Sequence, residues 1–309
     1  MSVMGKTWII DENFDGVRLD RFLRRNYPHI PLSGIMRAIR TGEVRVNGSK
    51  AIPSYRLGEK DRVHVPFEDH VPQKASLGPS KGALDVVYMN ENIMVINKPC
   101  GLLSQPASRG EDSVVNRAIG LINRHKGEFA PTPVHRLDRN VSGVMVLALN
   151  LPSLRALTKL FRDRKVIKKY LAIVKGTLIG EGEIDVSLKK DERFLKSVAC
   201  EGDGKKSITM YKSLYAGERA SLVELELLTG RPHQLRAHLS YIGHPIIGDI
   251  KYGGYKEGVK RPMLHAHVLE FLMHDSDLDY LSGKKFTAHV PKDMTETLKL
   301  FQIDPNIPY

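Results

Sequence analysis

The pattern of apolar positions in the first part of the chain predicts two short helices followed by a small sheet. Residues 19–23 carry an apolar stripe at the i, i+3, i+4 spacing of a helix face. A second stripe over residues 35–39 ends before Gly42, and glycine is a common helix terminator. Alternating residues then lead into Asn47-Gly48, a pair that favours a type I′ turn between two strands.

The rest of the chain mixes short strand patterns with single helices. Residues 222–228 place apolar side chains on one face and glutamates on the other, the period of two of a half-buried strand. Helix patterns occupy residues 113–126, with Ser113 as N-cap, 154–161, and 232–242, with a proline in its first turn. Further strand patterns occupy residues 85–88, 93–97, 144–149 and 170–174. Without regular βαβ repetition, this order predicts an α+β fold with helices flanking a largely antiparallel mixed sheet.

Composition divides the chain into two units joined by a linker. Residues 68–83 lack periodicity and are rich in Pro, Gly, Ser and Lys, which is typical of a linker. We therefore expect a small α+β domain over residues 14–67 and a larger α+β domain over residues 84–309.

The charge balance indicates a polyanionic partner. The 309 residues include 47 Lys and Arg against 35 Asp and Glu, a net charge of +12, which favours RNA or DNA over an acidic membrane. The longest nearly uncharged apolar stretch, residues 141–151, is too short to span a membrane, and the N-terminus lacks a signal-peptide pattern. Two cysteines cannot build a disulfide framework. We expect a cytoplasmic protein that makes no membrane contact and acts as a monomer.

The motifs of common cofactor and nucleophile sites do not occur in the sequence. It contains no phosphate-binding G-x-x-x-x-G-K-[ST], no G-x-S-x-G nucleophile elbow and no zinc-binding H-E-x-x-H. His265 and His267 are spaced to share one strand face, which is only a weak indication of a metal site. We therefore expect chemistry that needs no metal, nucleotide or organic cofactor.

The first unit resembles the S4-like RNA-binding domain. The resemblance covers about 50 residues and rests on Arg18-Leu19-Asp20, Gly42-Glu43-Val44, Val46-Asn47-Gly48 and Leu57-Gly58 with Asp61. It implies that the basic second helix binds RNA. Arg37, Arg40 and Arg45 are the expected phosphate contacts, because guanidinium groups suit bidentate phosphate binding. The alternative is a basic face that is merely solvated.

The most distinctive string of the chain is His135-Arg136-Leu137-Asp138-Arg139, which leads through Ser142-Gly143 into an apolar strand. An acidic residue between two arginines at the mouth of a buried strand suits an ionised carboxylate, because a nearby guanidinium favours the charged form. From the residues alone, the favoured explanation is a structural role, in which this aspartate caps a turn and pairs with Arg136 or Arg139.

The pattern H-R-L-D-x-x-x-S-G resembles the signature of the RluA family of pseudouridine synthases. Further matches follow in the family's order: Asn97-Lys98-Pro99, Lys169-Tyr170, Arg231-Pro232-His233-Gln234-Leu235-Arg236, Gly248-Asp249 with Tyr252-Gly253, and Leu264-His265-Ala266. With the S4-like segment the resemblance covers most of the chain, and it is closest to the RluC-type enzymes that modify large-subunit ribosomal RNA. The chain departs from the family at Gln105, Val141 and Pro232, and none of these removes an implied catalytic group.

The resemblance implies a role for each motif. Asp138 is then the essential carboxylate, which either attacks covalently or takes the C2′ proton of a uridine extruded from the RNA. Arg236 steers this carboxylate and Tyr170 stacks on the uracil. The implied substrate-binding residues are His135, Arg136, His233 and Leu264. Without the resemblance, each of these side chains also has an ordinary structural explanation.

These observations together predict an RNA pseudouridine synthase that acts on structured, most simply ribosomal, RNA. The basic segment 155–169, which leads into Tyr170, suits phosphates that flank the target nucleotide. The alternatives are a non-catalytic S4-type module that binds ribosomal RNA, a synthase directed to transfer RNA, and a metal-independent nuclease or glycosidase. A glycosidase requires paired carboxylates, and no second acid is evident near Asp138.

Overall fold

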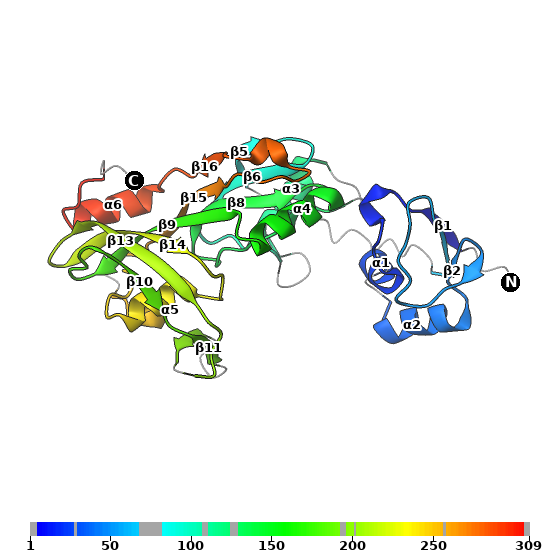
Figure 1. Cartoon of the computed structure of the whole chain (residues 1–309), viewed down its shortest axis with the longest axis horizontal. Helices are drawn as coiled ribbons and strands as arrows, with labels where there is room; N and C mark the ends of the chain where they lie inside the picture. The colour runs from blue at the N-terminus through cyan, green and yellow to red at the C-terminus, as the bar shows by residue number, and fades with distance from the viewer. Residues whose placement is uncertain are drawn as a thin grey trace.

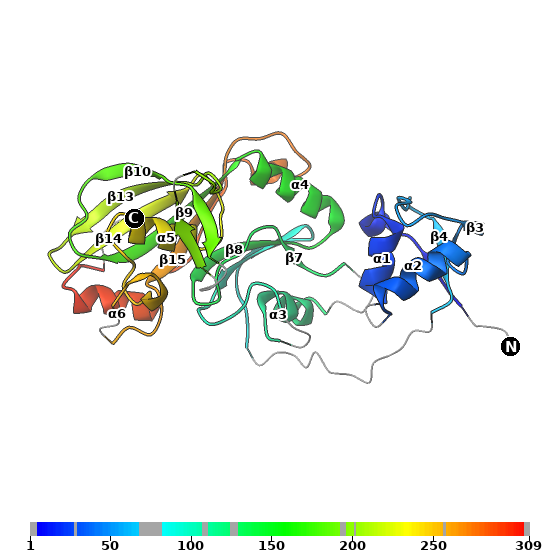
Figure 2. The ribbon, with the colours of Figure 1, turned by 90° about the horizontal axis from the view of Figure 1, so that it is seen from below.

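The structure is a computed structural model. It describes residues 5–27, 30–67, 82–106, 111–123, 129–191, 196–200, 202–255 and 258–305. The expected linker 68–83 lies outside these residues, apart from its last two positions. In Figures 1 and 2 a small N-terminal unit, coloured blue, lies beside a larger body that contains the rest of the described chain. Within the described residues, no helix is long and apolar enough to cross a membrane.

The N-terminal unit packs two helices against a four-stranded antiparallel sheet of order β1-β4-β2-β3. Its elements are β1 (Lys6–Ile9), η1 (Glu12–Phe14), α1 (Leu19–Asn26), α2 (Leu32–Thr41), β2 (Arg45–Val46), β3 (Ser49–Lys50) and β4 (Arg62–Val65). The two apolar stripes expected from the sequence are confirmed as the core of this unit, with Leu19, Phe22, Leu23 and Ile39 fully buried.

The turns of the N-terminal unit also follow the sequence pattern. Helix α2 ends at Gly42, whose φ of 82° lies in the left-handed region that glycine adopts without strain. Asn47 and Gly48 join β2 to β3 and both have positive φ, at 51° and 78°. A type I′ turn requires this conformation at both central residues, so the expected hairpin is confirmed.

A ten-stranded sheet organises the larger body, with the path β10-β13-β14-β9-β15-β8-β6-β5; β16 pairs with β15 and β7 with β8. The strands are β5 (Asp85–Met89), β6 (Ile93–Lys98), β7 (Thr132–Pro133), β8 (Ser142–Ala148), β9 (Val166–Lys175), β10 (Glu181–Asp185), β13 (Ile208–Ala216), β14 (Ala220–Leu227), β15 (Leu264–Phe271) and β16 (Lys285–Thr287). All pairs are antiparallel except β15 with β8. This confirms the predicted α+β class and the largely antiparallel mixed sheet.

Helices and a separate hairpin complete the larger body (Figure 1). They are α3 (Val114–Leu121), α4 (Leu151–Arg162), α5 (Gln234–Tyr241), η2 (Ile250–Tyr252), η3 (Asp279–Leu281), α6 (Lys292–Leu300) and the hairpin β11 (Leu188–Asp191) with β12 (Lys196–Ala199). Ser113 caps α3 as predicted, since its hydroxyl accepts the Asn116 N–H at 3.2 Å. This helix ends at Leu121, earlier than expected, and residues 124–126 of the expected helix lie outside the described residues.

The parallel contact between β8 and β15 depends on one glycine. Gly143 pairs with Ala266, and a Cβ at this glycine would lie 2.1 Å from the Ala266 carbonyl oxygen. Its φ of 124° is also one that L-residues rarely adopt. On the neighbouring pair, the Ser142 hydroxyl lies 3.0 Å from Nδ1 of His265. Ser142 and Gly143 of the signature therefore fix the strand that directly follows Asp138.

Candidate active site

Asp138 lies in the loop between β7 and β8, and the residues on both of its sides are pinned by the segment after β6. The Ser104 hydroxyl donates to the Leu137 carbonyl at 2.8 Å and accepts the Leu137 N–H at 3.1 Å. The fully buried Lys98 ammonium donates to the Arg139 carbonyl at 3.2 Å, and to two carbonyls of its own segment. These bonds hold the loop in one conformation and so fix where the Asp138 carboxylate points.

Arg236 of α5 binds two carboxylates at once. Its Nε and Nη2 donate to both oxygens of Asp249, at 2.6 and 2.8 Å, and its Nη1 donates to Asp138 Oδ2 at 3.0 Å. Burial disfavours the guanidinium charge, but the hydrogen bonds and charge of Asp249, helped by Asp138, outweigh it and raise the Arg236 pKa. The guanidinium is therefore charged and aimed at Asp138, which is 30% exposed at its side chain.

His233 brings a second nitrogen towards the same carboxylate. Its Nε2 lies 3.6 Å from Asp138 Oδ2, and its Nδ1 lies 3.0 Å from the Tyr252 hydroxyl. That hydroxyl accepts the Ser197 N–H at 2.9 Å, so its own proton is available to His233 Nδ1. Burial lowers the His233 pKa, although Asp138 opposes this. The network therefore assigns the neutral tautomer that carries its proton on Nε2, facing Asp138.

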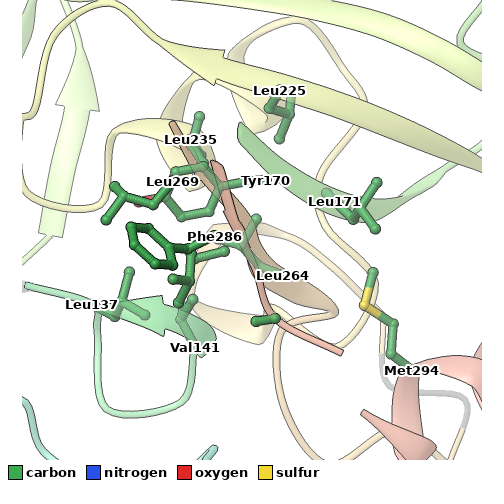
Figure 3. Packing of buried hydrophobic residues seen from close by; sticks show 14 of the residues in the cluster. Leu137, Val141, Tyr170, Leu171, Leu225, Leu235, Leu264, Leu269, Phe286 and Met294 are labelled. Carbon is green, nitrogen blue, oxygen red and sulfur yellow. The ribbon is translucent and has the colours of Figure 1, made fainter. Parts of the chain in front are cut away.

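Tyr170 closes the apolar side of a cavity above Asp138. It projects from β9 and is 7% exposed, and burial followed by the charge of Asp138 raises its pKa. Figure 3 shows its ring beside Leu235 and Leu264, with Leu137 and Val141 of the Asp138 loop nearby. The cavity is lined by Arg136, Leu137, Asp138, Val141, Tyr170, Leu227, Arg231, His233, Gln234, Leu235, Arg236 and Leu264. An aromatic ring, a carboxylate and a guanidinium thus share one space.

Comparison with known proteins identifies the family to which the chain belongs. Residues 92–241 match the family model described as RNA pseudouridylate synthase, and residues 17–63 match the S4 domain model. The ribosomal large subunit pseudouridine synthase D of Borreliella burgdorferi is 34% identical, with 93% of this chain and 90% of that protein covered. The chain belongs to the RNA pseudouridine synthase family. This pseudouridine synthase is of the RluA type and carries an S4 domain.

Two further similarities extend across the pseudouridine synthase. The ribosomal large subunit pseudouridine synthase C of Vibrio cholerae is 34% identical, with 91% of each chain covered. The solved structure of human RNA pseudouridylate synthase domain containing 4 is 27% identical and has a TM-score of 0.56, with 71% of this chain and 93% of that chain covered. The chain is thus an isomerase acting on RNA, as the sequence predicted.

The structure brings most of the expected site residues of the synthase together. Asp138, Tyr170, Arg236, Arg136, His233 and Leu264 all line the cavity. The ion pair of Asp138 is with Arg236, whereas the Arg139 guanidinium donates to the Gly101 carbonyl at 3.1 Å. Among the described residues, no ion pair joins Asp138 to Arg136 or Arg139, so pairing with a sequence neighbour does not describe this aspartate.

His135 does not reach the cavity, so its expected role in substrate binding is not supported by its position. Its ring stacks on Phe161 of α4, with the centroids 5.0 Å apart, and its Nε2 accepts the Val146 N–H at 3.1 Å. Burial, helped by the charge of Lys168, lowers its pKa to about 3. This histidine is neutral and braces β8 against α4.

The helix expected over residues 232–242 begins later than predicted, at Gln234. The Gln234 amide fixes the preceding turn, since its oxygen accepts from Thr229 and the Arg231 N–H, and its nitrogen donates to the Ile208 carbonyl. His233 precedes the helix with a left-handed φ of 53°. Its approach to Asp138 therefore comes from this turn.

Four residues of the site received no role from the sequence. Asp249 and Tyr252 belong to the matched Gly-Asp and Tyr-Gly pairs, and they hold Arg236 and His233. Lys98 and Ser104 pin the Asp138 loop. For Lys98 the sequence did offer a signal, since this lysine ends a strongly apolar strand. A buried ammonium at such a position needs several hydrogen-bond acceptors.

Basic residues outside the cavity divide into two groups. Arg37 and Arg40 on α2 and Arg45 on β2 are exposed, as RNA contacts require. In the basic segment 155–169, three basic side chains line a second hollow that shares Arg231 with the active site: Arg162, Arg164 and Lys168. Arg155, by contrast, donates to the Asp15 carbonyl of the N-terminal unit.

The two histidines of β15, His265 and His267, both contact a backbone carbonyl. Nε2 of His265 lies 3.2 Å and Nδ1 of His267 lies 3.0 Å from the same carbonyl oxygen, that of Ala288. Across the described ranges, no group of three His, Cys, Asp or Glu side chains is arranged to hold a metal ion. The spacing of these two histidines is therefore explained by a structural role, in which both rings connect β15 to the segment after β16.

Proposed function

We propose that this pseudouridine synthase is a cytoplasmic enzyme that isomerises uridines of large-subunit ribosomal RNA, with Asp138 as its essential carboxylate. The observation that carries the proposal is that Asp138, Arg236 and Tyr170 line one cavity, with the Arg236 guanidinium 3.0 Å from the carboxylate. In this proposal residues 84–309 form the catalytic domain and residues 14–67 form a domain that binds the RNA.

The reaction breaks the N1–C1′ bond of uridine and forms a C5–C1′ bond, while a proton leaves C5 and one is gained at N1. Asp138 assists in one of two ways. It attacks C1′ as N1 leaves, and C5 then displaces the carboxylate from C1′. Alternatively it takes the C2′ proton as N1 leaves, giving a glycal, and returns this proton to C2′ as C5 bonds to C1′. Both routes need an ionised carboxylate of fixed direction, which the Arg236 donor and the pinned loop supply. Tyr170 stacks on the uracil once the uridine has left the RNA fold.

Large-subunit ribosomal RNA is the proposed substrate because relatives that align with most of the chain are named as pseudouridine synthases of the large ribosomal subunit. Both the B. burgdorferi and V. cholerae relatives are named for the large ribosomal subunit. A net charge of +12 and the exposed arginines of the S4 domain favour a structured polyanion. No feature of the cavity favours transfer RNA.

The test is an isosteric substitution that removes only the charge of the carboxylate. RNA is isolated from a strain that lacks the gene, incubated with the wild type, D138N or D277N, and mapped for pseudouridine. Asp277 is exposed and lies outside the cavity, so D277N is the matched control. We expect conversion in large-subunit RNA by the wild type and D277N but none by D138N, which still binds RNA. Conversion by D138N would remove the proposed role, and conversion only in transfer RNA would replace the proposed substrate.

A further inference from the structure

Another hollow, separate from the one lined by Arg162, Arg164 and Lys168, adjoins the active site and has no role in the chemistry described above. It has a volume of about 460 Å³ and shares Arg231 and His233 with the catalytic cavity. Its walls come from the hairpin β11–β12, from the turn before α5 and from the segment that follows β12: Leu188, Lys189, Lys190, Lys196, Ser197, Asp203, Lys205, Arg231, Pro232 and His233. The volume falls in the usual range of small-ligand sites.

The lining of this hollow combines a basic rim with apolar surface. Five of its side chains are Lys or Arg and one, Asp203, is acidic, so the rim attracts an anion. Leu188 and Pro232 supply apolar surface, and Lys205 is exposed at the rim. A nucleotide has the matching chemistry, because its base is flat and largely apolar on its faces and its phosphate is negative.

We propose that this hollow is a subsite for a nucleotide next to the target uridine, whose base packs on Pro232 and whose phosphate meets Lys205 and Arg231. The proposal rests on the proposed function, because the uridine must occupy the cavity that contains Asp138. Arg231 and His233 border both spaces, so the spaces adjoin, as sites for neighbouring nucleotides of one strand require.

The subsite is also joined to the catalytic groups by direct contacts. The Ser197 hydroxyl donates to the Pro232 carbonyl, and the Ser197 N–H donates to the Tyr252 hydroxyl that holds His233. The Tyr252 ring lies under both Lys196, at 5.7 Å, and the Arg236 guanidinium, at 4.8 Å. A nucleotide in the subsite therefore lies against Ser197 and Pro232, and Ser197 is connected through Tyr252 to His233.

The test compares two lysine substitutions that change the net charge equally. K205Q removes one of the positive charges at the rim. K299Q on α6 removes the charge of an exposed lysine that lines neither space. Binding is measured over a salt series with a synthetic RNA that contains the uridine mapped above. We expect K205Q to weaken binding about tenfold and to reduce the salt slope by about 1, while K299Q changes neither by a comparable amount.

Neutral methylphosphonate linkages then locate the contact. Each linkage near the target uridine is replaced in turn, and binding to the wild type, K205Q and K299Q is compared. We expect one linkage next to the uridine to weaken binding to the wild type and K299Q but not to K205Q, because the effects of two partners in one contact do not add. If K205Q and K299Q respond alike at every linkage while the wild type still forms pseudouridine, the subsite is wrong and the proposed function stands. If the wild type forms no pseudouridine, both fail.

Discussion

At the scale of single residues, the site depends on a guanidinium that two aspartates share. Asp249, with a side chain 1% exposed, takes two donors of Arg236 and leaves Nη1 for Asp138. A lysine in this place could not reproduce the planar fork, because its ammonium is a point charge. The buried Asp249 therefore sets the direction in which Arg236 meets the Asp138 carboxylate.

Tyr252 gives a prediction at this scale, because its proton decides the tautomer of His233. Burial raises the Tyr252 pKa to about 12, so the phenol is protonated at neutral pH and donates to Nδ1. In Y252F this donor is lost, and neutral His233 is free to present an unprotonated Nε2 to Asp138, an arrangement that repels the carboxylate. We expect kcat for pseudouridine formation to fall about tenfold at neutral pH.

The pH profile of Y252F distinguishes this effect from general loosening of the site. Below the His233 pKa, which burial holds under its usual value, both ring nitrogens carry protons, so Nε2 presents a proton to Asp138 with or without Tyr252. The ratio of wild-type to Y252F kcat should therefore shrink as the pH falls. Y241F, which removes an exposed hydroxyl, is the control. A ratio that is constant with pH would show that Tyr252 does not act through His233.

At the scale of elements, the approach of β8 to β15 determines where the Asp138 loop ends. G143A places a Cβ 2.1 Å from the Ala266 carbonyl oxygen, and the clash falls on backbone that cannot rotate away. G101A is the matched control, because Gly101 also has a positive φ, of 85°, but no atom lies within 4 Å of its Cβ position. We expect urea unfolding to show a loss of about 1 kcal/mol for G101A and of more than about 3 kcal/mol for G143A. Equal losses would mean that the strand contact tolerates a methyl group.

His265 makes the same strand pair sensitive to acid. Burial, partly offset by the hydrogen bond with Ala288, lowers its pKa to about 4. Because the unfolded histidine takes its proton near about pH 6.5, the unfolded state binds more protons between these values, and the free energy of unfolding falls as the pH drops. By pH 4 the loss approaches about 3 kcal/mol. H265Q should flatten this slope, whereas H289Q, at an exposed position, should leave it unchanged. Parallel slopes for H265Q and the wild type would contradict this assignment.

Elements with local signals were predictable, and contacts between distant segments were not. The Asn47-Gly48 hairpin and the Ser113 cap follow from neighbouring residues alone. The start of α5 could not be predicted from neighbouring residues, because the turn before it is fixed by a hydrogen bond from Gln234 to the Ile208 carbonyl, 26 positions away. In the site, the cavity was foreseen from motif resemblance, but Lys98 and Asp249 act through loops that only the fold brings together.

At the scale of the whole molecule, two units have separate cores, and in the proposed function one binds the RNA while the other carries out the chemistry. The core of the N-terminal unit is built within residues 10–65, and the catalytic cavity lies wholly in the larger body. The units meet where Arg155 of α4 binds the Asp15 carbonyl and where Arg25 lies 5.2 Å from the Phe129 ring. Substitutions on the exposed face of the S4 domain should therefore change RNA affinity without altering the geometry around Asp138.

The triple variant R37Q/R40Q/R45Q tests this division. The three arginines are exposed, so their loss leaves the core intact, and each phosphate contact removed lowers the salt slope by about 1. We expect weaker binding to ribosomal RNA, with a slope reduced by up to about 3, and an unchanged rate of pseudouridine formation at saturating enzyme. The control is K292Q/K299Q on α6, which removes exposed charge from the larger body. A loss of rate at saturation would mean that the S4 domain also positions the target uridine, and an unchanged slope would mean that the basic face is only solvated.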